Sequence, residues 1–378
     1  MITAKAPGKL YIAGEYAVVE NGYPAILVAL NQFVTCTITE AKDEVGQIIS
    51  RQYHDNSLQW RRRGDQMVVD KRDNPFSYIL SAINVTEEFA RSLNQRLGIY
   101  NIRIDSQLDS QSGKKYGLGS SAAVTVATVK ALCEYYQLPV NKEMIFKLSS
   151  IAHFDVQGNG SLGDVAASVY GGWIAYRSFD RQWLSEQRHY LDLPALLSLP
   201  WPDLKIEPLD APANLALLIG WTGKPASTSR LVDKISLFKA KQQDEYHRFL
   251  DRSKACIHRM IDGFHTSDLD KIKEEIRYNR NLLQELAHRS GVQIETPLLK
   301  KLCQIAEEFG GAAKTSGAGG GDCGIVAIDG HADLPAVLDF WAKSRIEHLP
   351  LSVYFVNNIR RYTCLLYTSP SPRDGATS

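Results

Sequence analysis

The sequence lacks the features of several common classes of protein. Its 378 residues have a net charge of only +1, so the chain as a whole has no positive field that would gather nucleic acid or an anionic membrane. Its six cysteines include no Cys-x-x-Cys pair, which argues against a zinc site or a redox motif. We therefore expect buried free thiols, as in a reducing cytoplasm, and no nucleic-acid partner.

Long apolar runs are also missing. The N-terminal segment MITAKAPGKLYIAGEY contains no apolar signal core, and no uninterrupted apolar run is long enough to span a bilayer. The sequence thus predicts a cytoplasmic protein that does not act at membranes and that binds a small molecule. It carries no indication of oligomeric state.

The regular alternation of strands and helices that typifies a Rossmann sheet is absent too. Strand-like patterns follow one another through the first 70 residues, and helical spacing of apolar residues appears over 77–97 and 120–138. Asn141 is placed to cap a further helix that begins at Lys142. These patterns predict a mixed α+β fold.

The chain is long enough, and at 44% apolar content rich enough, for two domains with separate cores. The proline-marked stretch 183–212 has no clear periodicity and is expected to be a linker region. We place the N-terminal domain at 1–200 and the C-terminal domain at 201–362. The second domain is expected to contain three long amphipathic helices after Ser229 and to close with a strand near the segment LSVYFV. Residues 363–378 are polar, rich in proline and serine, and unlike the rest, so we expect a disordered or artefactual tail.

What the sequence does contain is glycine in short, chemically suggestive segments. The first segment is KAPGKLYIAGEYAV, in which Lys9 lies between Gly8 and Gly14 at the start of a predicted strand. A lysine at such a place can contact a phosphate, although an ordinary turn lysine beside a hairpin fits the same pattern.

The second segment, GLGSSAA, resembles a phosphate-binding loop but is not a Walker A loop, because no Gly-Lys-Ser/Thr follows its glycines. Gly117 and Gly119 allow backbone N–H groups to approach an anion, and the helix that starts at Ser120 presents its positive end to it. The hydroxyl of Ser120 or Ser121 could ligate Mg²⁺. A glycine turn with serine N-caps is the structural alternative.

The third segment, KTSGAGGGDCG, runs from Lys314 to Gly324 and has four glycines between Gly317 and Gly321. A hairpin loop seldom needs four glycines, so we favour a backbone that a ligand approaches closely.

Between the second and third segments lies GNGSLGDVAASVYGG, with Ser161 and Asp164. Asp164 could cap a helix, or it could be a carboxylate aimed at a reacting group. Phosphoryl transfer needs a lysine to offset charge on the moving group and a carboxylate to orient the acceptor.

In this order, the segments resemble the motifs of the GHMP kinases, the family that includes galactokinase, homoserine kinase and mevalonate kinase, and the resemblance covers most of the chain. It implies a two-domain fold, with an N-terminal domain like that of ribosomal protein S5 and a ferredoxin-like C-terminal domain. The active site would lie in the cleft between the two domains.

The resemblance also assigns roles. Lys9 and Asp164 would be the catalytic residues. The ATP-binding residues would be Gly117, Leu118, Gly119, Ser120, Ser121 and, on the adenine side, Asn74. Ser120 or Ser121 would hold Mg²⁺.

Within the family, the segments KKYGLGSS, NGSLGDVA and GWTGKPASTSRLV look most like those of members that act on phosphomevalonate. A phosphate acceptor is already ionised near neutral pH, with a second pKa of about 6, so repulsion between phosphates is the difficulty and extra cations near the loop are expected. The expected substrate-binding residues are Lys115, Ser161, Ser229, Arg230, Ser316, Gly317, Ala318 and Gly319. Two alternatives remain: a family member with another substrate (a mevalonate kinase or a diphosphomevalonate decarboxylase) and a non-catalytic nucleotide-binding regulator.

Overall fold

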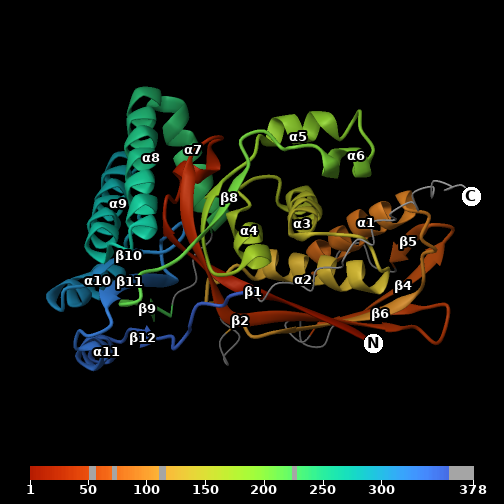
Figure 1. Cartoon of the computed structure of the whole chain (residues 1–378), viewed down its shortest axis with the longest axis horizontal. Helices are drawn as coiled ribbons and strands as arrows, with labels where there is room; N and C mark the ends of the chain where they lie inside the picture. The colour runs from red at the N-terminus through yellow and green to blue at the C-terminus, as the bar shows by residue number, and fades with distance from the viewer. Residues whose placement is uncertain (51–56, 70–74, 110–115, 224–227, 357–378) are drawn as a thin grey trace, which may run out of the picture.

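The structure, a computed structural model, describes residues 1–50, 57–69, 75–109, 116–223 and 228–356, with residues 228–230 described by their backbone alone (Figure 1). Two sheets, each with its own helices, lie at opposite ends of the molecule. No helix within these ranges combines the length and the apolar character needed to cross a membrane.

The larger sheet belongs to the first half of the chain. Its strands follow the order β5-β4-β3-β6-β2-β7-β8, and β1 pairs with β2 beside this path. The strands are β1 (Ile2–Ala13), β2 (Pro24–Glu40), β3 (Gly46–Ser50), β4 (Ser57–Arg63), β5 (Gln66–Val69), β6 (Tyr100–Ser106), β7 (Trp173–Arg177) and β8 (Lys205–Leu209).

Helices of the first half gather on one face of this sheet, as Figure 1 shows. They are α1 (Ser77–Ser92), α2 (Ser120–Tyr135), α3 (Lys142–Gln157) and α4 (Gly163–Tyr170). Helix α2 contacts β1, β2 and the other three helices, so it lies at the centre of this layer. It has ten buried residues, which explains why its sequence is apolar nearly all round.

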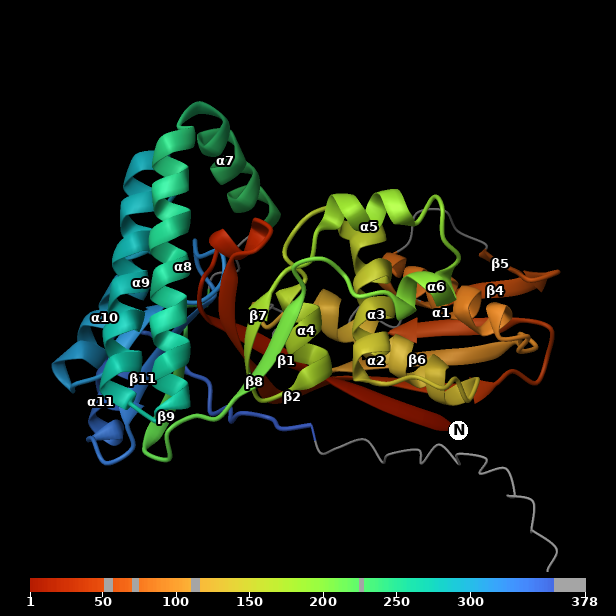
Figure 2. The same ribbon diagram turned by 45° about the horizontal axis from the view of Figure 1, so that its top comes forward.

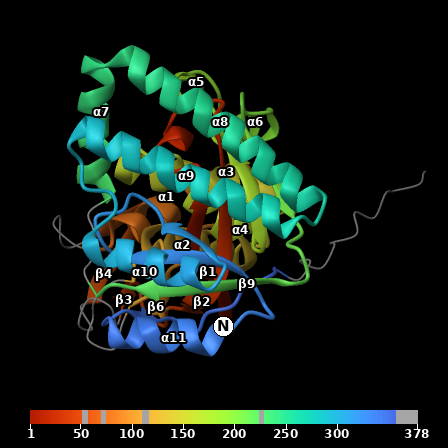
Figure 3. The ribbon, with the colours of Figure 1, turned by 90° about the vertical axis from the view of Figure 1, so that its left-hand side faces the viewer.

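The second half forms a smaller antiparallel sheet in the order β10-β11-β9-β12. Its strands are β9 (Leu215–Trp221), β10 (Ala312–Thr315), β11 (Cys323–Asp329) and β12 (Glu347–His348). The long helices α8 (Gln243–His265) and α9 (Leu269–Ser290) run side by side, with α10 (Pro297–Glu308) and α11 (Leu334–Lys343) nearer the sheet (Figure 3).

The predicted α+β class is confirmed, and so is the N-cap at Asn141, whose side chain accepts a hydrogen bond from the backbone N–H of Met144 at 2.9 Å. The structure has four helices where we predicted three long ones after Ser229. The first is divided at Gln242 into α7 (Thr228–Lys241) and α8.

The linker expected over 183–212 is wrong. This stretch contains α5 (Arg181–Gln187), α6 (Leu193–Ser198) and β8, and β8 pairs with β7. Its apolar residues, among them Leu184 and Trp201, are buried, so tertiary packing orders the segment. Its elements are too short to show a periodic pattern of apolar residues in the sequence.

The predicted domain boundary at 200/201 stays a prediction: β8 of the large sheet ends at Leu209, and β9 of the small sheet begins at Leu215. The predicted tail at 363–378 lies outside the described residues.

The expected closing strand of the second domain is also wrong, because this segment crosses back to the large sheet. We call residues 350–356 the C-terminal strap. Val353 and Phe355 form isolated bridges with Leu30 and Gly171. Tyr354 donates its N–H to the Ala29 carbonyl at 2.9 Å and accepts from the N–H of Gly172 at 2.7 Å. The strap therefore ties the end of the second half to the first.

Candidate active site

A cavity of about 720 Å³ lies where the glycine-bearing segments meet. The predicted site residues that line it are Lys9, Gly117, Gly119, Ser120, Ser121, Ser161, Asp164, Ser316, Gly317, Ala318 and Gly319. Segments more than 300 residues apart in the chain thus form one site, as the resemblance implied.

Lys9 reaches this cavity across Gly119. Its backbone N–H donates to the carbonyl of Leu118 at 2.9 Å, which fixes β1 against the loop. Gly119 has φ +78°, and a Cβ at this position would lie 2.9 Å from Cε of Lys9. Only glycine therefore allows both this backbone conformation and the path of the lysine side chain.

Gly117 allows a similarly close approach of the third segment to the phosphate-binding loop. It has φ +81°, and a Cβ there would lie 2.7 Å from the carboxyl carbon of Asp322. The thiol of Cys323 donates to the carbonyl of Tyr116 at 3.2 Å. The phosphate-binding loop is thus packed directly against the glycine-rich loop of the small sheet.

The N-terminus of α2 faces the cavity without a side-chain cap. Its N-cap is Gly119 in the left-handed region, and within the described residues no side-chain cap bonds to its first N–H groups. Serine N-caps, the structural alternative for this segment, are therefore wrong. The uncapped N–H donors and the positive end of the helix are suited to a phosphate group.

His153 lies beside this helix end. Its Nε2 is 3.2 Å from the hydroxyl of Ser121, and the side chain is buried. Burial lowers the pKa of the imidazole, against the influence of Asp164, so the ring is neutral at neutral pH. Among the described residues, its Nδ1 has no hydrogen-bond partner.

Asp164 stands in the first turn of α4, and its Oδ1 accepts from the N–H of Val165 at 3.0 Å. The N-cap of α4 is Leu162, at φ 62°, so Asp164 does not cap the helix and its carboxylate lines the cavity. Leu162, two residues before this carboxylate, is thus a non-glycine residue in the left-handed region, a strained conformation that is common at functional sites.

Ser161 is held from both sides. Its hydroxyl lies 2.8 Å from the Tyr11 hydroxyl, and its carbonyl accepts from Tyr176 at 2.6 Å and from Ser178 at 3.0 Å. Burial, and then the charge of Asp164, raise the pKa of Tyr11, so its hydroxyl keeps its proton. These bonds fix the wall that carries Asp164.

Glu15 and Lys314 join the first and third segments, and sequence reasoning missed both. They form an ion pair in which both side chains are almost fully buried. Glu15 also accepts from the N–H of Gly317 at 3.3 Å, and Tyr16 donates to the carbonyl of Ala318 at 2.5 Å. The partners are about 300 positions apart, so no local pattern could have paired them.

Four predicted residues cannot be located with their side chains. Asn74 and Lys115 lie outside the described residues. Ser229 and Arg230 belong to the first turn of α7, but their side chains are outside the described part of the structure. Val232, one turn later, lines the cavity.

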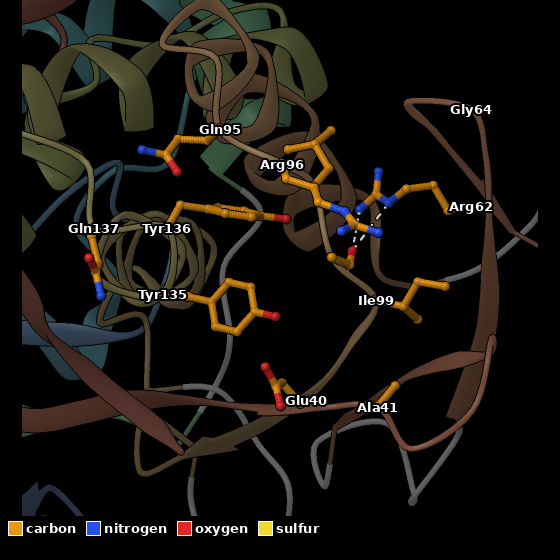
Figure 4. Close-up of a pocket in the computed structure, with 12 residues that line it drawn as sticks. Glu40, Ala41, Arg62, Gly64, Gln95, Arg96, Ile99, Tyr135, Tyr136 and Gln137 are labelled. Atoms are coloured by element: carbon orange, nitrogen blue, oxygen red, sulfur yellow. Dashed lines mark hydrogen bonds between the residues drawn. The ribbon is translucent and has the colours of Figure 1, made fainter.

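A second cavity, of about 780 Å³, lies at the far end of the large sheet (Figure 4). Its Arg62 forms a bidentate pair with Glu87 and donates to the carbonyl of Gly98. None of the glycine-bearing segments lines it. Arg62 is thus already paired within the protein, and the predicted site is the first cavity.

Comparison with known proteins identifies the family to which the chain belongs. The family model described as GHMP kinases N terminal domain matches residues 77–172, and that described as GHMP kinases C terminal matches 260–347. The chain belongs to the GHMP kinase family.

Its relatives include a phosphomevalonate kinase from Streptomyces sp. (strain CL190), 36% identical with 93% of this chain and 96% of the relative covered. A phosphomevalonate kinase from Saccharolobus solfataricus is 30% identical, with 92% and 95% covered. A solved structure of Streptococcus pneumoniae phosphomevalonate kinase in complex with phosphomevalonate and AMPPNP is 30% identical, with a TM-score of 0.82 and 94% and 100% covered.

Proposed function

We propose that the protein transfers the γ-phosphoryl group of ATP to 5-phosphomevalonate, giving 5-diphosphomevalonate and ADP. The observation that carries this proposal is the convergence of Lys9, the uncapped N-terminus of α2 and Asp164 on one cavity. A solved relative that covers the same length of chain is a complex with this acceptor and an ATP analogue.

ATP would bind with its phosphates at the loop from Gly117 to Ser121. Backbone N–H groups and the positive end of α2 supply the attraction, in place of the lysine of a Walker A loop. Asn74 would belong to the adenine side.

Mg²⁺ fits the residues of the cavity. The hydroxyls of Ser120 and Ser121 and the carboxylate of Asp164 are oxygen donors, which Mg²⁺ prefers, and it commonly keeps several waters and substrate phosphates as its other ligands. In the described ranges no group of three or more His, Cys, Asp or Glu could hold a metal ion by itself. When bound, the ion would neutralise charge on the β- and γ-phosphates.

Lys9 is placed to stabilise negative charge on the transferred phosphoryl group, because its side chain crosses the phosphate-binding loop. Asp164 orients the acceptor. It does not need to act as a strong base, because a phosphate monoester with a second pKa of about 6 is already largely ionised at neutral pH.

The acceptor carries a carboxylate and a phosphate, and both need cations. Lys9 supplies one cation at the cavity, so Lys115 and Arg230 are the residues that we assign to the acceptor's anionic groups, with Ser229 beside them. Ser161 and Ser316 have a structural part as well, since both bond to Tyr11, and with Gly317, Ala318 and Gly319 they shape the wall.

A turnover assay tests the proposal. The purified protein is given ATP, Mg²⁺ and, in turn, phosphomevalonate, mevalonate or diphosphomevalonate. We expect ADP release only with phosphomevalonate. Phosphorylation of mevalonate alone would make the protein a mevalonate kinase, release of CO₂ from diphosphomevalonate would make it the decarboxylase, and ATP binding without turnover would make it a regulator.

A further inference from the structure

Helix α7 borders the active-site cavity. Ile235 and Phe238 anchor it in the apolar core, and it contacts both α8 and α9. Val232 faces the cavity from its first half. Figure 2 shows α7 above the red turn that follows β1, and this turn belongs to the N-terminal half of the molecule.

That turn is the short 3₁₀ helix Ala17–Val19, and it forms the facing wall. Val18 and Val19 both line the cavity. Arg181 donates to the carbonyl of Val19 and, at 3.0 Å, to the hydroxyl of Ser178, so the turn rests on a fixed support. Glu20 follows immediately.

Glu20 connects the two walls. The ammonium of Lys239, from the last turn of α7, lies 2.8 and 2.9 Å from its two carboxylate oxygens. Tyr246, on α8, donates its hydroxyl to Oε1 of Glu20 at 3.2 Å. Tyr246 is buried, and the Lys239 ammonium lies 5.8 Å from the centre of its ring.

We propose that Glu20, Lys239 and Tyr246 form a clasp between the domains that fixes α7 over the acceptor end of the cavity. Glu20 is then a positioning residue for acceptor binding, although it contacts no substrate. The inference rests on the proposed function in one respect, the identity of the acceptor.

The lining of the cavity indicates which end is left for the acceptor. Ser121 of α2 and Tyr78 of α1 line the cavity on the side of the phosphate-binding loop. Tyr16 and Ala318, joined by a hydrogen bond, line it together with Val18, Val19 and Val232. With ATP phosphates at the N-terminus of α2, α7 borders the space that remains for the second substrate.

The chain offers a matched control of the same chemistry. Arg252 of α8 forms a bidentate pair with Glu285 of α9 at 2.5 and 3.2 Å and also donates to the Tyr278 hydroxyl at 3.0 Å. This cluster also joins a cation, a carboxylate and a tyrosine across helices, but it lies wholly within the C-terminal half.

The kinetic test compares Glu20→Gln, Lys239→Met, the double variant and the control Glu285→Gln. An exposed ion pair contributes enough to change an equilibrium about two- to fivefold. We therefore expect each single variant to raise the KM for phosphomevalonate by about two- to fivefold, with little change in the KM for ATP. The double variant should be no worse than the worse single one, since both remove one interaction. Glu285→Gln should leave both KM values unchanged.

Equal increases in both KM values, or no increase in either, would overturn the proposal. Hydrogen exchange of the α7 amides in the protein without substrate gives a readout that does not depend on the acceptor. Glu20→Gln should speed this exchange and Glu285→Gln should not. If the wild-type protein does not use phosphomevalonate but α7 still loosens in Glu20→Gln, the proposed function fails and the clasp stands. If α7 does not loosen, the clasp fails whatever the substrate is.

Discussion

At the scale of single residues, the site depends on one close approach. The side chain of Lys9 occupies the space that a Cβ on residue 119 would need. This contact, together with the positive φ, explains why the loop needs glycine there even before a nucleotide binds. It links the first motif to the second in addition to the backbone hydrogen bond from Lys9 to Leu118.

Gly119→Ala should therefore displace Lys9. A displacement of about 1 Å in a catalytic group costs on the order of a hundredfold in rate, so we expect kcat/KM to fall by about that factor. Gly310→Ala is the control, because Gly310 has a similar φ of +81° and no atom within 4 Å of an added Cβ. Both variants should lose about 1–2 kcal/mol of stability to backbone strain, and only Gly119→Ala should lose activity. Full activity in Gly119→Ala would contradict this account.

Site residues that belong to short sequence motifs could be predicted from the sequence. The glycines and serines of the phosphate-binding loop could be predicted because the pattern that identifies them is short. Lys9 and Asp164 were assigned by the family resemblance, and the structure places both at the cavity. Glu15 with Lys314 and Glu20 with Lys239 could not be predicted, because each pair forms only when elements from the two halves come together.

At the scale of elements, α2 combines a site-forming N-terminus with a half-buried lysine farther along. Within the described residues, the ammonium of Lys130 has a long contact of 3.5 Å with the carbonyl of Ser168 in α4. Burial, and then the charge of Lys142, lower the pKa of Lys130 to about 8 from 10.5.

Lys130→Met should stabilise the protein at neutral pH by about 2 kcal/mol, since a pKa shift of one unit corresponds to about 1.4 kcal/mol. Below pH 8 the amine is charged in both the folded and the unfolded states, so the wild-type protein bears the full cost of burying it. Between pH 8 and 10.5 the folded state loses its proton first, and the difference between wild type and variant should shrink. Denaturant unfolding at pH 7 and pH 10.5 measures the difference in unfolding free energy between wild type and variant. A difference that does not change with pH would refute the lowered pKa of Lys130.

Sequence patterns predicted the long elements well and the short ones poorly. Helices α1, α2 and α3 have 16 residues each, enough turns to show their period or cap. Helices α5 and α6 have seven and six residues, and β8 has five, so their order comes from the residues that they bury and not from any repeat.

At the scale of the whole molecule, the C-terminal strap is one of the connections that join the two halves. Its backbone pairs with Asn31 and Gly172, and the ring of Tyr354 packs edge-on against Phe33 at 4.7 Å. A chain that ends at Leu349 would lose all of these contacts, while a chain that ends at Val356 would keep them.

We expect the chain ending at Val356 to unfold like the full-length protein, and the chain ending at Leu349 to unfold at least about 3 °C lower, because each hydrogen bond contributes about 0.5–1.5 kcal/mol. Calorimetry of the two chains measures this difference in unfolding temperature. A single, unshifted transition for the chain ending at Leu349 would show that the strap is dispensable.

The buried pair of Glu15 and Lys314 also has a consequence for how the protein is made. The two side chains are 299 positions apart. At about 5–20 residues per second, Glu15 leaves the ribosome some 15–60 s before its partner exists. During that time its carboxylate has to remain in water, because a buried charge without a partner is too costly. The active site therefore cannot close before Lys314 has been synthesised, and a nascent chain cannot capture ATP in a complete site before the third glycine segment has emerged.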